Sequence, residues 1–212
     1  MSLLKEKTSL NECVEIRVSR RPGNVFDIYL HNEILEPHYY VDLLTTLRNC
    51  MDHDDVRIYI NSYGGNVATT FQIINAMKQC PAPVTTIIES EAHSAASLIF
   101  LAGQNYVIQP GAAMLCHYYS GGEWGKGHEL KSAIDFKDKH FKLQFKYLYE
   151  HFLSTEELEQ LFSGTDFWLN AVEIKKRLQN KVEIINKVKE TKEHSKKKHR
   201  KTHKKIEDIQ EN

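Results

Sequence analysis

The sequence predicts an α/β fold built on a mainly parallel sheet, and three observations support this. Short apolar runs rich in β-branched residues alternate with helical patterns between residues 25 and 116. A glycine-containing turn follows one of these runs, and a cluster of small residues follows another. The chain has 212 residues, of which 41% are hydrophobic, so it can bury one sizeable core with a small appendage.

The expected elements follow in order from the N-terminus. Residues 1–24 are polar and are typical of an arm or a hairpin before the core. Five strands are expected, at Val25–Leu30, Val56–Ile60, Val84–Ile88, Tyr106–Gln109 and Ala113–Cys116. Helices are expected between the earlier strands, at residues 37–50, from after Asn66 to about Gln79, and at residues 95–102.

The second half of the chain begins with a glycine stretch at residues 121–127, and a long helix is expected from about His128 to Phe152. The wide apolar stripe of this helix either packs on the core or contacts another copy of the chain. Residues 154–157 form a capping box for the next short helix. The predicted organisation is an N-terminal arm (1–24), a central domain (25–180) and a basic tail (181–212).

The charge is divided unevenly along the chain. Of 28 Lys and Arg and 28 Asp and Glu, residues 181–212 hold 11 and 6, which leaves 17 and 22 for the first 180 residues. The tail is interpreted as a disordered, solvated extension, and the alternative is contact with nucleic acid or an acidic partner. The four scattered cysteines favour free thiols in a reducing compartment. No signal peptide or membrane span is recognised, so a cytoplasmic location is expected.

Ser94 lies where an apolar strand gives way to small residues and then to an apolar helix. A strand that leads into a helix directs the connecting side chain outward, and the first free N–H groups of the helix favour negative charge beside it. The turn at residues 61–66 ends the neighbouring strand. Active sites of parallel sheets lie at the carboxyl ends of the strands, so Ser94 and this turn are expected to form one site.

A serine nucleophile needs a base and a group that orients the base. His117 follows the run Ala113–Cys116 and therefore lies at a strand end, near the same edge of the sheet. His93 is a poor base because the side chains of adjacent residues diverge. Asp166 lies in a turn between two helical patterns and is the candidate orienting carboxylate. Taken singly, His117 also fits a structural histidine, and Asp166 fits a turn or helix N-cap.

Four segments in this order resemble the Clp protease proteolytic subunit family, the ClpP-like serine proteases, over residues 25–178. These segments are residues 58–65, the segment around Ser94, residues 114–117 and residues 165–170. The glycine and serine motifs fit the family's spacing without a gap, and so do the 49 positions from His117 to Asp166. The 23 positions from Ser94 to His117 are fewer than in the family, by a small deletion in the linking hairpin.

This resemblance implies a serine endopeptidase with a ClpP/crotonase-like spiral fold. It implies that Ser94 is the nucleophile, His117 the general base and Asp166 the residue that orients the base. It also implies an oxyanion hole made by the backbone N–H groups of Gly65 and Ala95. Glycine allows close backbone approach and position 95 begins a helix, so the physical chemistry agrees with these two roles. No metal and no other cofactor are implied.

The resemblance further implies a homo-oligomer, with a sevenfold ring and two rings stacked face to face. The helix at residues 128–152 would then be a protruding handle that joins the rings. Gly64, Gly121 and Gly122 would bind the substrate, because the glycine stretch leads into a strand that pairs with an extended peptide. The family also uses an unfolding ATPase, which docks in apolar pockets on the rim of the ring.

The sequence departs from the family in three places. Tyr63 replaces the proline before the two glycines, and Ala95-Ala96 replaces Met-Gly after the nucleophile. Alanine keeps the backbone N–H, so the chemistry is expected to survive. Positions that match the docking pocket are polar in part: Arg57, Gln79 and Glu89 are polar, whereas Tyr59 and Ile87 fit. An unpaired ion buried in such a pocket is costly, so the hypothesis is that no standard Clp ATPase binds.

Three other functions remain open at this stage. A phage head-maturation type of protease would act without a Clp ATPase, and short divergent ClpP-like chains of viruses and phages are similar in this respect. A crotonase-type acyl-CoA enzyme shares the fold and the backbone oxyanion hole but does not need the three residues Ser94, His117 and Asp166. A catalytically silent ring scaffold could retain all three residues in a misaligned arrangement.

Overall fold

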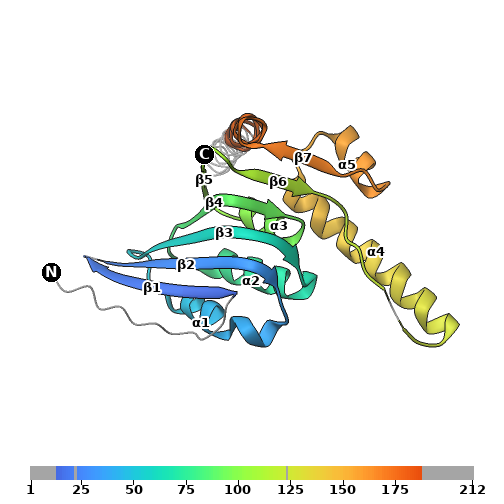
Figure 1. Ribbon diagram of the computed structural model, residues 1–212, viewed down its shortest axis with the longest axis horizontal. Coiled ribbons are helices and arrows are strands. Elements are labelled where there is room, and N and C mark those ends of the chain that lie inside the picture. The colour runs from blue at the N-terminus through green and yellow to red at the C-terminus, as the bar shows by residue number, and fades with distance from the viewer. Residues whose placement is uncertain (1–12, 22, 123, 188–212) are drawn as a thin grey trace, which may run out of the picture.

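The computed structural model describes residues 13–21, 23–122 and 124–187, which form a seven-stranded sheet with helices packed on it (Figure 1). The strands are β1 (Val14–Arg21), β2 (Gly23–Ile34), β3 (Asp55–Gly65), β4 (Val84–His93), β5 (Asn105–Ile108), β6 (Ala113–Cys116) and β7 (Phe167–Asn170). The helices are the 3-10 helix η1 (Pro37–Tyr40), α1 (Val41–Asn49), α2 (Val67–Gln79), α3 (Ala95–Leu101), α4 (Gly127–Tyr149) and α5 (Thr155–Phe162). A further helix follows β7 and is described over residues 171–187.

The sheet has the order β1-β2-β3-β4-β6-β7, and β5 also pairs with β4. The pairs β2–β3, β3–β4, β4–β5 and β4–β6 are parallel. The mainly parallel α/β fold predicted from the alternation of strands and helices is therefore confirmed. β1 and β2 form an antiparallel hairpin in which Val14 lies opposite Leu30. The described part of the predicted N-terminal arm (1–24) therefore adds a strand to the sheet of the central domain.

Strand β4 has two partners in succession on one side. Its first part, Thr85–Ile88, pairs with β5, and its last part, Glu91–His93, pairs with β6. The strand is longer than the predicted Val84–Ile88 and reaches the residue before Ser94. This pairing places the ends of β4 and β6 beside each other, although His93 and Leu115, its partner in the ladder, are 22 positions apart in the sequence.

The core lies between the sheet and the helices α1, α2 and α3, which lie along one face of it (Figure 1). In β3, Val56, Ile58 and Ile60 are fully buried and alternate with partly exposed residues, as expected for side chains that point alternately to the two faces. All seven residues of α3 are buried, in agreement with the predicted buried helix. The helix that follows Ser94 is thus held on every side.

Helix α4 projects from the body of the molecule (Figure 1). Near its C-terminal end Phe145, Leu148 and Tyr149 are buried, whereas Ile134 and Leu143 are exposed. Core packing is therefore confirmed for the C-terminal end of α4, whereas the rest of the helix leaves apolar surface uncovered in the single chain, and contact with another copy stays a prediction.

The last described helix crosses the predicted boundary at residue 180, and Lys181 is buried in the body of the protein. The greater part of the predicted basic tail, residues 188–212, lies outside the described residues, as do residues 1–12 of the predicted N-terminal arm. In the part of the chain that the structure describes, no helix combines the length and the apolar character needed to cross a membrane.

Candidate active site

Ser94 occupies the corner between β4 and α3 with a backbone conformation that is rare outside glycine (φ 54°, ψ −125°). Its N–H donates to the Leu115 carbonyl of β6 at 2.9 Å. Its carbonyl accepts from the Ser97 N–H at 3.0 Å and from the Ser97 Oγ at 2.6 Å. Such a conformation costs on the order of 1–3 kcal/mol and persists only where the surroundings enforce it. Ser94 Oγ caps no helical N–H, so it stays available for other chemistry.

Gly64 packs directly against this corner. A Cβ atom at position 64 would lie 2.7 Å from Ser94 Cβ and 2.8 Å from the His93 carbonyl oxygen, and Gly64 itself has φ +96°. Only glycine satisfies both the lack of space and the positive φ. The sequence prediction that the glycine turn and Ser94 lie together thus agrees with the geometry of the backbone.

The backbone N–H groups of Gly65 and Ala95 lie on either side of the Gly64–Ser94 contact. The Asn66 N–H donates to the Ile34 carbonyl of β2 at 2.7 Å, and Gly65 is the ladder partner of Ile34. In a parallel ladder alternate residues of a strand bond to the same neighbour, so the Gly65 N–H points away from β2. The Ala95 nitrogen begins α3 and lies 3.0 Å from where a Cβ of residue 64 would be. The first N–H groups of a helix have no partner within it.

His117 and Asp166 meet at the same edge of the sheet through the pairing of β6 with β7. These strands are antiparallel, with Cys116 opposite Phe167, so one step further along the ladder His117 faces Asp166. The strands β4, β6 and β7 lie side by side (Figure 1), and therefore Ser94, His117 and Asp166 lie in this order across one edge. His117 is half-buried and Asp166 is exposed.

The side chains of these three residues are not hydrogen-bonded to one another in the described part of this single chain. The structure thus brings the three segments together but does not close the side-chain links. Catalytic hydrogen bonds are often long before substrate binds and shorten in the reacting complex. The arrangement permits a Ser-His-Asp relay once the His117 ring and the Asp166 carboxylate turn toward each other.

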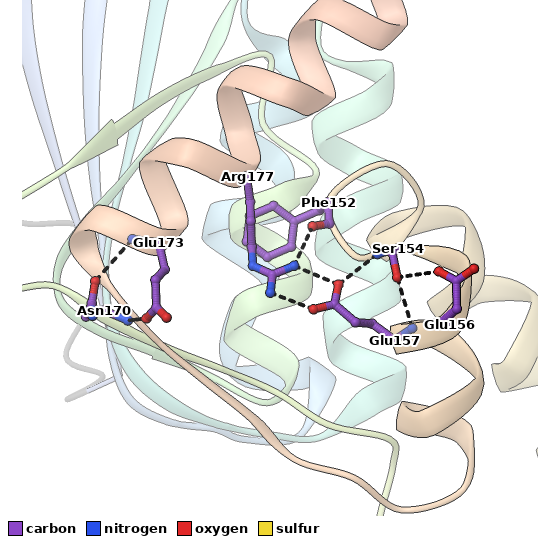
Figure 2. A network of polar contacts seen from close by, with 7 residues as sticks. All are labelled: Phe152, Ser154, Glu156, Glu157, Asn170, Glu173 and Arg177. Carbon is purple, nitrogen blue, oxygen red and sulfur yellow. Dashed lines mark hydrogen bonds and ion pairs between the residues drawn. The ribbon is translucent and has the colours of Figure 1, made fainter.

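The segment that carries Asp166 is held at its N-terminal side by a polar network (Figure 2). Glu157 N–H donates to Ser154 Oγ at 3.2 Å, and Ser154 N–H donates to the Glu157 carboxylate at 2.8 Å, so the predicted capping box of α5 is confirmed. Arg177, from the last helix, binds both carboxylate oxygens of Glu157 at 2.7 Å and the Phe152 carbonyl at 3.3 Å. The Arg177 guanidinium lowers the pKa of Glu157.

A second cap holds the C-terminal side of the same segment (Figure 2). The Asn170 side chain accepts from the N–H groups of Val172 and Glu173 at 3.0 and 3.1 Å, and the Glu173 carboxylate accepts from the Asn170 N–H at 2.9 Å. This pattern starts the last helix directly after β7. Asp166 therefore lies on a short connection between two capped helices, which fixes its backbone although its side chain is exposed.

A pocket of about 480 Å³ lies beside the glycine turn. One wall consists of Gly65 and the start of α2, and the opposite wall includes Gly121, Gly122 and the α4 residues Ile134 and Phe141. The structure thus brings three of the predicted glycines to one pocket or its rim. A larger pocket of about 920 Å³ lies between α4 and α5, and neither Ser94 nor His117 lines it; we give it no part in the chemistry.

Two residues near Ser94 were not singled out in the sequence as site residues. Ser97 and Tyr149 are fully buried, and Ser97 Oγ lies 2.7 Å from the Tyr149 hydroxyl. Ser97 follows Ser94 by one helical turn, which is a weak local signal, whereas Tyr149 gives no signal because its contact depends on the packing of α4. Among the described residues no cluster of His, Cys, Asp and Glu side chains could hold a metal ion.

His93 and the predicted docking positions also have defined surroundings. The His93 ring packs edge-on against Trp168, with centroids 5.2 Å apart. Arg57 forms an ion pair with Asp55 at 2.8 Å and is partly exposed, so it is neither a deeply buried nor an unpaired ion. Tyr59 stacks on Tyr29 at 4.8 Å. The remaining docking positions differ in exposure: Gln79 and Glu89 are exposed and Ile87 is buried.

The fold and site define a class of protein with a parallel α/β sheet, a serine in a constrained strand-to-helix corner and a glycine turn packed against it. Comparison with known proteins is consistent with this class. The Clp protease family model matches residues 22–182. The chain is 26% identical over 155 residues to an ATP-dependent Clp protease proteolytic subunit of Bacteroides fragilis, covering 72% of each chain. It is 27% identical over 154 residues to the protein of the same name from Porphyromonas gingivalis, covering 71% of this chain and 66% of that one.

The chain belongs to the Clp protease family. It is a divergent, ClpP-like member, as the modest identity to these relatives indicates. The resemblance inferred from four short segments of the sequence is thereby confirmed, together with the fold that it implied.

Proposed function

We propose that this protein is a serine endopeptidase that cleaves extended or unfolded polypeptides through Ser94, His117 and Asp166. Ser94 Oγ attacks the scissile carbonyl carbon while His117 accepts its proton. His117 then protonates the leaving amine, and a water molecule releases the acyl group from Ser94 by the reverse proton path. Asp166 orients the imidazole and stabilises its charged form. The family membership supports proteolysis, and the assignment of these roles is our own.

The observation that carries the proposal is the Ser94 corner. Ser94 is a non-glycine residue at φ 54°, and its hydroxyl does not cap the helix that follows. The strained backbone therefore has a conformational cost that helix capping does not explain. We assign the oxyanion hole to the backbone N–H groups of Gly65 and Ala95, and the packing of Gly64 against Ser94 and the Ala95 nitrogen supports this assignment. Loss of one such donor lowers the rate about 10²–10³-fold. Because the donors are backbone N–H groups, glycine at position 65 and alanine at position 95 can both supply them.

The substrate is proposed to enter along the pocket beside the glycine turn. Gly65, Gly121 and Gly122 line it without side chains, and Gly64 precedes Gly65 in the same turn, so an extended peptide can approach the backbone and pair with it. Ile134 and Phe141 give the pocket an apolar wall. These features favour a polypeptide over an acyl-CoA thioester, for which this chain offers no distinct observation.

We further propose that copies of the chain assemble into a ring, with seven subunits and face-to-face stacking as in the family resemblance. The exposed apolar residues of α4 support assembly, because surface of this kind is seldom left open on a monomer. They are Ile134, Phe136, Leu143 and Tyr147. We also propose that no standard Clp ATPase binds, because Arg57, Gln79 and Glu89 make the docking positions polar. The ground is this polarity and not a buried unpaired ion, since Arg57 pairs with Asp55.

Two further assignments remain proposals. A cytoplasmic location is supported by the four cysteines, which are all buried and form no disulfide. Contact of the basic C-terminal residues with nucleic acid or an acidic protein is supported by their charge alone. Binding that falls steeply with salt and disappears on truncation after Asn180 is the expected signature of such contact.

The proposed function is tested by labelling with a fluorophosphonate and by cleavage of a fluorogenic peptide. Wild-type protein is expected to be labelled at Ser94, and Ser94→Ala and His117→Ala are expected to lower peptide cleavage by about 10⁴-fold or more. Matched controls are Ser90→Ala, an exposed serine of the same strand, and His53→Ala, an exposed histidine. Both controls should retain full activity.

The same experiment separates the alternatives. An assembled protein that is neither labelled nor active would indicate a silent scaffold. Turnover of an acyl-CoA thioester that survives Ser94→Ala would indicate a crotonase-type enzyme, because that chemistry does not need the serine.

A further inference from the structure

A chain of buried hydrogen bonds runs behind the Ser94 corner and joins three elements. Ser97 Oγ lies 2.6 Å from the Ser94 carbonyl oxygen and 2.7 Å from the Tyr149 hydroxyl. The Cys116 thiol and the His117 backbone, at the end of β6, lie close to the Tyr149 hydroxyl. Ser94 follows β4, Ser97 belongs to α3, and Tyr149 is the last residue of α4. The side chains of Ser97, Tyr149 and Cys116 are fully buried.

The direction of each hydrogen bond follows from the chemistry of the groups. A carbonyl only accepts, so the Ser97 hydroxyl donates to the Ser94 carbonyl. Ser97 has then used its one proton, and therefore the Tyr149 hydroxyl donates to Ser97 Oγ. The hydrogen bonds therefore run from the Tyr149 hydroxyl to Ser97 Oγ and from the Ser97 hydroxyl to the Ser94 carbonyl.

This chain links the C-terminal end of α4 to the backbone of the candidate nucleophile, and it passes close to the backbone of the candidate base. The Ser94 carbonyl belongs to the residue that has the strained φ of 54°, and the strain persists only if neighbouring bonds enforce it. Every polar contact of the Tyr149 hydroxyl leads to the α3 start or to the end of β6. A phenylalanine would keep the ring packing against Phe145 equally well, so core packing does not account for the hydroxyl.

We propose that Tyr149 is a positioning residue that, through Ser97, holds the Ser94 backbone and so sets the position of the Ser94 hydroxyl relative to the His117 ring. This inference rests on the proposed function of the site. Tyr149 touches no reacting atom and acts only through Ser97. Because Tyr149 is the last residue of α4, whose other end projects from the body (Figure 1), a shift of this helix would move the Tyr149 hydroxyl and, through Ser97, the Ser94 backbone.

The test is Tyr149→Phe, which removes one hydroxyl and keeps the ring. The rate of fluorophosphonate labelling and kcat for a fluorogenic peptide are expected to fall roughly 10- to 100-fold, as for small misplacement of a catalytic group. KM should change less than about twofold, because Tyr149 does not line the substrate pocket. This split between kcat and KM separates positioning from a general loss of structure.

The matched control is Tyr106→Phe. The Tyr106 hydroxyl donates to the Leu101 carbonyl at 3.1 Å, at the opposite end of the same helix α3. Both variants lose one hydroxyl hydrogen bond to this helix, so a similar change in thermal midpoint is expected, whereas only Tyr149→Phe should slow labelling and turnover. Ser97→Ala interrupts the same chain at its next member and should slow labelling to a similar degree. The double variant Ser97→Ala with Tyr149→Phe should be no slower than the slower single variant.

Each outcome has a distinct meaning. Equal labelling rates and kcat in Tyr149→Phe and Tyr106→Phe, or additive effects of Ser97→Ala and Tyr149→Phe, would overturn the role of Tyr149 while leaving the proposed function intact. Wild-type protein that is not labelled, or label that persists in Ser94→Ala, would overturn the proposed function itself and this inference with it.

Discussion

The two sides of the candidate site differ in how completely one chain builds them. On the side of β3, β4 and α3, every residue of α3 is buried and Gly64 fits against Ser94 with no space for another atom. On the side of β6, β7 and α4, Asp166 is exposed and α4 presents uncovered apolar side chains. The proposed nucleophile is thus fixed by the core of the chain, whereas Asp166, the proposed orienting acid, and helix α4 are the parts that another copy or a substrate can still adjust.

The largest effect is expected from Gly64→Ala, on the complete side. Its Cβ would collide with Ser94 Cβ and the His93 carbonyl, and the positive φ adds strain. The free energy of unfolding should fall by about 2–4 kcal/mol, and labelling of Ser94 should be abolished. Gly111→Ala is the matched control, because no atom lies within 4 Å of a Cβ there. Denaturant unfolding and fluorophosphonate labelling measure both variants, and normal labelling of Gly64→Ala would refute a tight corner.

An intermediate effect concerns Lys181, which joins the two sides by donating to the carbonyls of Leu101 and Leu148. Burial lowers the pKa of Lys181 from 10.5 to about 8. Between these values the unfolded chain holds the proton more readily than the folded one, so this group makes stability rise as pH increases from about 8 to 10.5. Below pH 8 the folded state carries the full cost of the buried charge.

The variant Lys181→Met should remove this dependence. Relative to wild type, its gain in stability between pH 8 and 10 is expected to be smaller by about 1–3 kcal/mol. Urea unfolding at several pH values measures the difference, with the exposed Lys176→Met as control. Parallel pH profiles for wild type and Lys181→Met would show that the ammonium is solvated.

A smaller effect is expected on the adjustable side, from Glu157→Gln. Arg177 lowers the pKa of Glu157, so the ion pair stabilises the fold above the unfolded pKa near 4.5 and this contribution is lost as pH falls through the lower folded pKa. Since both side chains are about one-quarter exposed, the loss at pH 7 should be about 1–2 kcal/mol. It should shrink toward zero in acid, as measured by urea unfolding at pH 7 and pH 3.

The smallest effect is expected from Asp55→Asn, which breaks the more exposed ion pair with Arg57. This change should lower the free energy of unfolding by less than about 1 kcal/mol, measured by urea unfolding at pH 7.

The same division explains what could be predicted from the sequence. The corner at Ser94, the glycine turn and strand β6 depend on local patterns, and their bounds were predicted to within a few residues. The meeting of His117 and Asp166 could be expected only from family spacing, because it arises from the antiparallel register of β6 and β7. Tyr149 could not be found at all, since its contact with Ser97 joins residues 52 positions apart and depends on how α4 packs.

Strand β7 is the last strand in the sheet order, so one of its sides has no neighbouring strand among the described residues. An unpaired strand edge presents backbone donors and acceptors to any chain that approaches it. Asp166 comes immediately before this strand. A chain that pairs with this edge, or a segment that covers it, therefore also acts on the backbone of Asp166, the proposed orienting carboxylate. Binding at the edge of the sheet would in this way change the rate of proteolysis without contact to Ser94.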